Sequence, residues 1–594
     1  MNTLSPDRHS SVALAALAAL AAPAAATAAT DARQAWPAEA PSPSPGAETA
    51  VGTAAALAAA TALSACGGGG DGAVTPAPAP APAAAPITDA QASRFLGQAA
   101  FGATDPLIGR VKALGYSAWL DEQLAQPIGP SRYDWMVAQG HAVEANISAF
   151  TGADNALWRK LIASPDVLRQ RVALALSEIF VVSMAGLPVL WRGLLVTAYA
   201  DLLETHCFAS YRSLLEAVTL SPAMGVYLNM RGNQREDLAT GRVPDENFAR
   251  EVLQLFAIGL QELNTDGSLR GGAATETYGP DTISNLAKVF TGWDFDNATR
   301  TDFAYVKRPM LFNAARHSVA EKRFLGTTIA AGTDGRVALG MALDTIAKHA
   351  NVAPFIGRQL IQRLVASHPS AAYVGRVSAV FNNNGAGQHG DLKAVIKAVL
   401  LDPEARSVDI ASPSASPSPT AGKLREPVVR LVQWARTFGL ASPTDLWNLG
   451  NQSDPATRLG QSPLRAPSVF NFFRPGYVPP NSALGTQGVT APEFQITNES
   501  TVMGWANYAQ TFVASGIGET RPDYSAELAL ATDAPALVRR VVLLLAADAL
   551  PAATETLIST AVASISAATD TGKRNRVYAA IHLVLCAPDY LVQV

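Results

Sequence analysis

The stretch SPDVLRQRVALALSEIFVVS, residues 164–183, carries the pattern that decides the fold. Ser164 suits the N-cap position of a helix, and Pro165 suits the first helical position because proline has no N–H to leave unpaired there. A nearly all-apolar run then extends to Val182. A helix that is apolar on all sides is buried in a protein core, so this stretch predicts a central helix.

Later stretches repeat the spacing of three and four residues that is typical of amphipathic helices. In residues 279–293 an apolar stripe ends at Gly292. Residues 351–365, 390–406 and 423–439 carry the same spacing, with a proline or aspartate near each start. Strict alternation of apolar and polar residues is hard to find. We therefore predict an all-α body with at most a few short hairpins.

The charge and hydropathy of the 594-residue chain limit its partners. It has 45 Lys+Arg against 49 Asp+Glu and no run of five basic residues, so the positive surface of a nucleic-acid-binding protein is missing. Hydrophobic residues make up 48% of the chain, which is enough for large buried cores. After residue 90 no apolar stretch has the length of a membrane-spanning helix. We expect no nucleic-acid partner, and membrane contact only through a lipid anchor.

The N-terminal region predicts an exported protein. Residues 11–30 resemble the Ala-rich core of an export signal. A second apolar stretch, residues 51–70, contains LSAC ending at Cys66, which resembles the lipobox of bacterial lipoproteins, whose cysteine is acylated. We interpret residues 1–66 as a disordered leader ending in a lipidated Cys66. The alternative is a merely flexible, low-complexity leader.

The composition after Cys66 predicts a tether and then a folded body. Gly-rich and Pro-Ala segments make residues 67–88 a flexible spacer before a helical body, residues 89–594. The protein would then lie in the periplasm or at the outer membrane as a lipoprotein. Within the body, the Ser/Pro-rich residues 412–422 predict an exposed loop, which either divides two domains or interrupts one. The other two cysteines, Cys207 and Cys586, are interpreted as buried free thiols.

A charged cluster opens the stretch DENFAREVLQLFAIGL, residues 245–260. In one interpretation Glu246 or Glu251 is a general base or metal ligand, and Arg250 holds an anionic substrate. In the other, which we favour, the cluster is a capped helix start. Its charges would be shielded from water and paired, Arg250 with Glu246 and Glu251 with Asn247, and would lock neighbouring helices together.

His317 and Glu321 are candidate metal ligands if their segment is helical, because they would then share one face. A third ligand would have to come from the acidic cluster near residue 250. A divalent metal is therefore possible but not favoured. The candidate catalytic set of the sequence is Glu246, Arg250, Glu251 and His317.

Glu178 is the only charged side chain between Arg171 and Arg192. Such a carboxyl group is either paired with an arginine of a neighbouring helix or held protonated by desolvation. We favour the paired state.

Motifs along the chain resemble a large bacterial family named for a domain of unknown function, number 1800. The matches include DENFAREVLQLFAIGLQELNTDG at 245–267, YGPDTISNLAKVFTGW at 278–293 and GQSPLRAPSVFNFFRPGY at 460–477, and they continue in order from residue 94 to residue 500. The resemblance implies an exported bacterial protein. Family members are often encoded beside sulfatase-like proteins of another uncharacterised family, and no activity is established for them.

Two hypotheses about function follow from the sequence. In the first, an exported, lipid-anchored helical protein binds another envelope protein, such as the sulfatase-like neighbour. In the second, the protein is an envelope hydrolase, possibly metal-assisted, that uses the acidic, Arg and His cluster. The sequence has no G-x-S-x-G, H-E-x-x-H, Walker or C-x-x-C motif, which disfavours the familiar hydrolase, nucleotide and dithiol chemistries.

Overall fold

The computed structural model describes residues 86–406 and 422–593. Residues 86–594 form a single compact unit, close to the predicted body of 89–594. The predicted export segments, Cys66, nearly all of the tether and all but the last residue of the 412–422 loop lie outside the described residues. Predictions about those segments therefore stay predictions.

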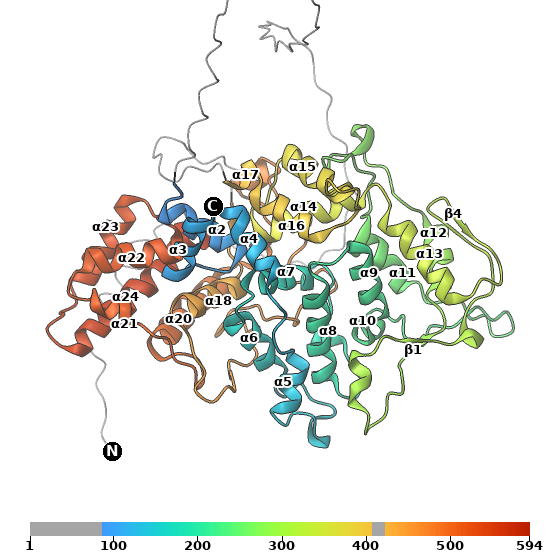
Figure 1. The fold of residues 1–594 in the computed structure, drawn as a ribbon, viewed down its shortest axis with the longest axis horizontal. Coiled ribbons are helices and arrows are strands. Elements are labelled where there is room, and N and C mark those ends of the chain that lie inside the picture. The colour runs from blue at the N-terminus through green and yellow to red at the C-terminus, as the bar shows by residue number, and fades with distance from the viewer. Residues whose placement is uncertain (1–85, 407–421, 594) are drawn as a thin grey trace, which may run out of the picture. The chain divides into compact units, whose positions relative to one another are not determined.

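The prediction of an all-α body is confirmed (Figure 1). Before the 407–421 gap the helices are α2 (Asp89–Ala99), α3 (Asp105–Leu114), α4 (Tyr116–Ala125), α5 (Arg132–Ala138), α6 (Ala153–Ala163), α7 (Val167–Ser177), α8 (Arg192–His206), α9 (Tyr211–Leu220), α10 (Pro222–Tyr227), α11 (Asn247–Glu251), α12 (Pro280–Val289), α13 (Gly335–Ala347), α14 (Val352–Leu364), α15 (Ala371–Asn382), α16 (Leu392–Leu401) and α17 (Pro403–Arg406). After it come α18 (Pro427–Thr437), α19 (Ala483–Thr486), α20 (Glu499–Ser515), α21 (Ser525–Ala529), α22 (Ala534–Ala546), α23 (Ala552–Ala563), α24 (Asp570–Cys586) and α25 (Pro588–Leu591).

Strands occur in the described residues only as short antiparallel pairs, as predicted. They are β1 (Trp293–Asp294) with β2 (Leu311–Phe312), β3 (Lys322–Phe324) with β4 (Thr327–Ile329), and β5 (Lys423–Leu424) with β6 (Val592–Gln593). The third pair joins the chain just after the gap to its C-terminal end.

The central helix is shorter than its sequence predicts. Ser164 ends α6 instead of capping α7, and α7 stops at Ser177. The apolar residues that follow leave the helix because their backbone is bonded elsewhere: the Phe180 carbonyl accepts from the Tyr199 hydroxyl at 2.6 Å. The predicted helices α12, α14, α16 and α18 are confirmed, and Asp391 caps α16 as expected.

Two groups of buried apolar side chains form the core. The first is built mostly from residues 92–405 and the second mostly from residues 428–590. The second also contains Trp158, Leu161 and Leu174 from α6 and α7, so helices from before and after the 412–422 loop share one core. The described segments before and after the gap therefore belong to one compact unit.

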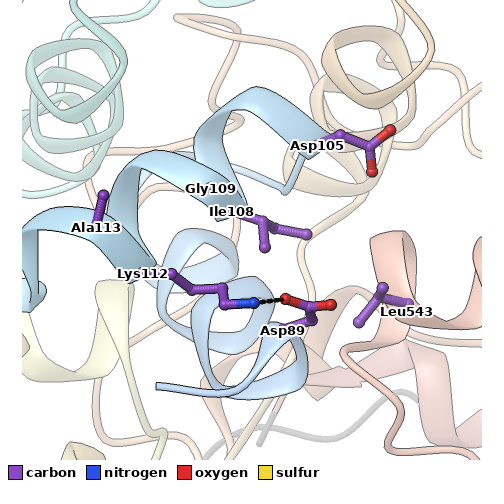
Figure 2. A pocket seen from close by; sticks show the side chains of 7 residues that line it. All are labelled: Asp89, Asp105, Ile108, Gly109, Lys112, Ala113 and Leu543. Atoms are coloured by element: carbon purple, nitrogen blue, oxygen red, sulfur yellow. Dashed lines mark hydrogen bonds and ion pairs between the residues drawn. The ribbon is translucent and has the colours of Figure 1, made fainter. Parts of the chain in front are cut away.

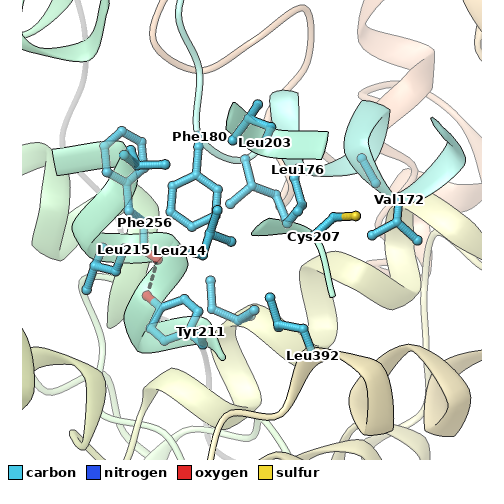
Figure 3. Close-up of a cluster of buried hydrophobic side chains, with 14 of the residues drawn as sticks. Val172, Leu176, Phe180, Leu203, Cys207, Tyr211, Leu214, Leu215, Phe256 and Leu392 are labelled. Carbon is cyan, nitrogen blue, oxygen red and sulfur yellow. Dashed lines mark hydrogen bonds between the residues drawn. The ribbon is translucent and has the colours of Figure 1, made fainter. Parts of the chain in front are cut away.

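Figure 3 shows part of the first core, where Cys207 lies among apolar side chains and the Tyr211 hydroxyl donates to the Phe256 carbonyl. Cys207 and Cys586 are both free thiols, as predicted, although Cys586 is only partly buried. In the described parts of the chain, no helix has the length and apolar character needed to cross a membrane.

Candidate functional site

The charged motif at residue 245 begins α11, at one end of the unit in Figure 1. Asp245 and Asn233 hold the start of this helix: the Asp245 N–H donates to Asn233 Oδ1 at 2.9 Å, and Asn233 Nδ2 donates to the Asp245 carbonyl at 3.0 Å. The Asp245 carboxylate accepts the Asn247 N–H at 2.8 Å. After Glu251 the helix continues as a π-helix, η3 (Val252–Ala257). Such i→i+5 turns are rare and are frequent at functional sites.

The predicted pairing of Glu246 with Arg250 is confirmed, but the predicted shielding of that pair is wrong. Their charged groups lie 3.4 Å apart with side chains 40% and 47% exposed. Glu246 also accepts a hydrogen bond from the Ser284 hydroxyl on α12. An exposed pair of this kind stabilises a protein by at most about 1 kcal/mol, so it contributes little to holding the neighbouring helices together.

Glu251 is buried, as predicted, but its predicted pairing with Asn247 does not occur. Its residue is 9% exposed, and Oε2 has no hydrogen-bond partner in the described structure. Among the buried carboxylates of residues 86–406 and 422–593, Glu251 alone forms no ion pair. The others, each paired with a cation, are Asp166, Glu178, Glu204, Asp402, Glu426, Glu493 and Glu527.

Two tyrosines share the surroundings of Glu251. Burial raises the pKa of Glu251, although the neighbouring Arg250 cation opposes this shift. Burial, and then the Glu251 charge, raise the pKa of Tyr278 to about 12 and also raise the pKa of Tyr227. The buried Tyr278 hydroxyl, like Glu251 Oε2, has no partner in the described residues. A desolvated acid beside a hydroxyl is the kind of group that transfers protons or holds a polar ligand.

The sequence alone did not single out these tyrosines. Tyr278 begins the stretch YGPDTISNL and Tyr227 ends α10, so both lie within the motifs of the family resemblance. An aromatic residue in an apolar stretch is ordinarily a core residue, and nothing in its spacing indicates a carboxylate neighbour. Only the packing of α10, α11 and the start of α12 brings them together.

A cavity of about 590 Å³ opens beside this group, lined in part by Tyr227, Asn229, Arg231, Asn233, Arg242 and Asp245. Tyr227 therefore belongs both to the cavity wall and to the surroundings of Glu251. Its ring packs against Gly186, where an added Cβ would lie 2.6 Å from the ring. The lining offers two guanidinium groups, one carboxylate and several amides, which suits a polar ligand more than an apolar one.

His317 does not join the group around Glu251. It is buried, and its Nδ1 lies 2.9 Å from the Thr291 carbonyl, which can only accept, so Nδ1 carries the proton. Burial lowers the pKa of His317, and the charges that act on it are Lys322, Asp334 and Glu236. The structure does not bring His317 together with the other three predicted catalytic residues.

The predicted metal pair of His317 and Glu321 rests on a helix that does not form. The segment contains one short 3-10 turn, η6 (Ala314–Arg316), and then the strand β3. Glu321 is exposed and pairs with Arg323 at 2.5 Å. The described residues contain no group of three or more His, Cys, Asp or Glu side chains that could hold a metal ion.

Glu178 belongs to a buried charge network where the two cores meet. It forms an ion pair with Arg363 on α14 at 3.5 Å, as favoured from the sequence. Burial, and then the charge of Glu426, raise the pKa of Glu178, while the Arg363 and Lys423 cations oppose that shift. Lys423 joins the network, lying 3.1 Å from Glu426 and 3.2 Å from Glu493. This network is sealed from solvent and serves the architecture.

A second hollow of about 570 Å³ lies between α2, α3 and α22 (Figure 2). Its charged side chains form ion pairs and are well exposed: Lys112 lies 2.6 Å from Asp89. Asp105 pairs with Arg540 at 2.9 Å. Because these charges are solvated and already paired, the hollow offers less chemistry than the cavity beside Glu251.

Fold and site together define an all-α protein in which every buried carboxylate of the described residues except Glu251 is paired. The chain belongs to the family described as protein of unknown function (DUF1800), whose model matches residues 94–592. The resemblance inferred from the sequence motifs is therefore confirmed. No curated protein and no solved structure matches the chain.

Proposed function

We propose that this protein works in the bacterial cell envelope, held by a lipid on Cys66, and that it binds another envelope protein. One observation carries the proposal. The loop of residues 235–244, here called the projecting loop, holds Leu238 with 98% of its surface exposed and Val243 with 76%. Burying one such side chain in a partner is worth about 1.5–3 kcal/mol, which makes the loop a strong candidate anchor.

The projecting loop is ordered by its own hydrogen bonds. The Asp237 N–H donates to the Arg242 carbonyl at 2.9 Å, and the Arg242 N–H donates to the Asp237 carbonyl at 3.1 Å. At its base the Arg235 N–H donates to the Arg316 carbonyl, and Glu236 accepts from the Ser318 hydroxyl at 2.9 Å. A loop fixed in advance loses little conformational entropy on binding, so more of the contact energy is available for affinity.

The position of the loop indicates the chemistry of the partner. Arg242 and Val243 line the cavity beside Glu251, and Arg231 lies in the same wall. A fitting partner would bury Leu238 in an apolar pocket and place a polar or acidic segment in the cavity. The family resemblance suggests a sulfatase-like envelope protein as this partner.

Site-specific photocrosslinking tests the proposal in the full-length chain within its own envelope. A photoreactive amino acid in place of Leu238 should give one main adduct with an envelope protein. The same residue in place of Leu557 on α23, which is 47% exposed at the other end of the unit, is the control. Leu238→Asp should weaken binding of the purified partner. Equal adducts at both positions, or binding unaffected by Leu238→Asp, would contradict the proposal.

The second candidate function is an envelope hydrolase. What supports it is Glu251, the one unpaired buried carboxylate of the described residues, next to the Tyr278 hydroxyl. In this function Glu251 is the general base or acid, Tyr278 offers a free hydroxyl to the substrate and Arg250 is an anion contact. Hydrolysis of chromogenic esters, phosphates and glycosides by the full-length protein tests it. Turnover that survives Glu251→Gln would exclude this assignment.

A further inference from the structure

A further cavity, of about 330 Å³, adjoins the one beside Glu251 and shares Arg231 and Pro188 with it. Its wall also contains Arg192, the first residue of α8, and the aromatic side chains Phe295 and Tyr305. At roughly 30 Å³ for each water-sized group, it holds about ten non-hydrogen atoms. That is the size of a small organic molecule and not of a polypeptide segment.

The charges of this cavity are unbalanced. Its lining contains two guanidinium groups and no carboxylate. Arg192 forms no ion pair or hydrogen bond with the described residues, and its buried Nε has no partner. The Arg192 guanidinium lies over the Phe150 ring, 4.7 Å from the ring centre, which fixes its position without neutralising it.

Arg231 is fixed by more contacts than Arg192, and its terminal nitrogens still have free N–H donors. Its Nε donates to Asp294 at 2.9 Å, and its guanidinium lies 4.1 Å from the centre of the Phe295 ring. Asp294 also pairs with Arg316 at 3.0 Å, so one carboxylate faces two cations. No hydrogen bond from the terminal nitrogens of Arg231 reaches another described residue. A planar guanidinium fixed at one edge is well placed to bind an anion with the other.

The rest of the wall is mostly apolar. The Phe295 and Tyr305 rings lie 4.9 Å apart at 44°. The Tyr305 hydroxyl donates to the Leu190 carbonyl at 2.6 Å, and the fully buried Tyr305 ring supports the Phe295 ring in the wall. An apolar wall beside two fixed cations selects a molecule that has an anionic group at one end and a ring or other apolar group at the other.

We propose that this cavity binds a small organic anion, with its carboxylate, phosphate or sulfate group held by Arg192 and Arg231 and its apolar group packed against Phe295. The site does not depend on the projecting loop. It is a binding site beyond the proposed function, and binding here needs neither Leu238 nor Glu251.

Titration calorimetry with the full-length protein in phosphate-free buffer tests the site. Phenyl phosphate and benzoate are the probes, benzyl alcohol supplies the ring without the anion, and inorganic phosphate supplies the anion without the ring. Phenyl phosphate and benzoate should each bind saturably at one site. Benzyl alcohol and inorganic phosphate should each bind at least about tenfold more weakly. The ratio between the two probes separates a preference for phosphate from one for carboxylate.

Three variants locate the binding. Arg192→Gln should weaken both probes about tenfold or more, because a hydrogen bond to a charged group is lost. Arg300→Gln is the matched control, since Arg300 is 61% exposed, pairs with Glu144 and does not line the cavity. Ala298→Trp fills the mouth of the cavity from an exposed position and should abolish binding even if Arg192→Gln fails to fold.

Four outcomes would overturn the assignment. They are no saturable binding of either probe, equal binding of inorganic phosphate, equal weakening by Arg300→Gln, and undiminished binding to Ala298→Trp. Loss of partner binding by Leu238→Asp with normal binding of phenyl phosphate would show that the two sites are separate.

Discussion

Replacing the Glu251 carboxylate by an amide should stabilise the protein at neutral pH. Glu251 is buried, and Oε2 has no partner among the described residues. Leaving such a charged group unsatisfied costs about 1–3 kcal/mol or more, and an amide of the same shape removes the charge. The Glu251 charge also raises the pKa of Tyr278 and Tyr227, so removing it relieves an unfavourable interaction with both hydroxyls. Glu251→Gln should therefore raise the free energy of unfolding by about 1 kcal/mol or more at pH 7.

Glu204 is the matched control because it is also buried but is paired. Its carboxylate lies 2.6 Å from Lys160 and also contacts Arg132. Removing one partner of such a buried group leaves its cations uncompensated and costs about 3–5 kcal/mol. Glu204→Gln should thus destabilise the protein, and the two substitutions, identical in chemistry, should have effects of opposite sign.

The two glutamates should also differ in pH dependence. Burial raises the folded-state pKa of Glu251, so its unfavourable charge is present above that pKa and disappears as the pH falls through it. The gain from Glu251→Gln should then shrink toward zero in acid. For Glu204, burial opposes ionisation, but Arg132 and Lys160 outweigh it and lower the pKa. Its stabilisation is present above the ordinary glutamate pKa and is lost as the pH falls through the lowered one.

Urea denaturation of wild type and both variants, between pH 7 and pH 4, measures these differences. The slopes of the transitions should agree, so that midpoints report stability. Glu251→Gln destabilising the protein at pH 7 as much as Glu204→Gln would refute the reasoning. Glu251 would then be part of a structural ion-pair lock, as the sequence alone had favoured.

Three further predictions address other parts of the molecule. Lys423→Met leaves Glu426 and Glu493 buried without their shared cation, so urea denaturation should show a loss of about 3–5 kcal/mol, and a loss below 1 kcal/mol would contradict the network. Leu238→Asp should leave the melting temperature unchanged in calorimetry because the side chain is 98% exposed, so a clear drop would mean that Leu238 packs within the chain. Cys66→Ser should abolish incorporation of labelled palmitate that the wild type shows, and equal labelling would exclude lipidation at Cys66.

Local signals predicted the helices whose ends are set locally. The Asp391 side chain accepts two backbone N–H groups at the start of α16, and Gly292 adopts a left-handed conformation just after α12. Both features can be recognised in sequence because the cap or stop residue is within a few positions of the helix. The end of α7 could not be recognised in this way. The Tyr199 hydroxyl bonds Phe180, and Met184 N–H donates to the Leu464 carbonyl, which is a contact between distant segments.

The candidate site was predicted only in part, for a geometric reason. A regular turn of 100° per residue places Glu251 on the same polar face as Arg250, and both were expected to be paired there. Both residues lie in α11, before the π-helix begins at Val252, yet Glu251 is buried while Arg250 is exposed. The packing of distant segments, and not the turn of the helix, therefore decides which of the two is covered. His317 fails as a ligand partner of Glu321 because residues 317–321 form no helix, and the strand β3 begins directly after them at Lys322. Neither outcome can be predicted from the spacing of residues along the chain.

A buried carboxylate without an ion-pair partner is informative here because the other buried carboxylates of the described residues all have one. Seven buried carboxylates in the described chain form ion pairs, so pairing is the rule for the buried acids of these residues. Glu251, near the cavity of about 590 Å³, has no ion-pair partner among the described residues. The Arg192 guanidinium, in the wall of the adjoining cavity of about 330 Å³, also forms no ion pair with them. The two cavities share Arg231, so both departures fall in one region of the surface. An unpaired buried charge reduces stability and is retained where it serves binding or chemistry. This region, which includes the projecting loop, is therefore where substitutions should impair function without unfolding the protein.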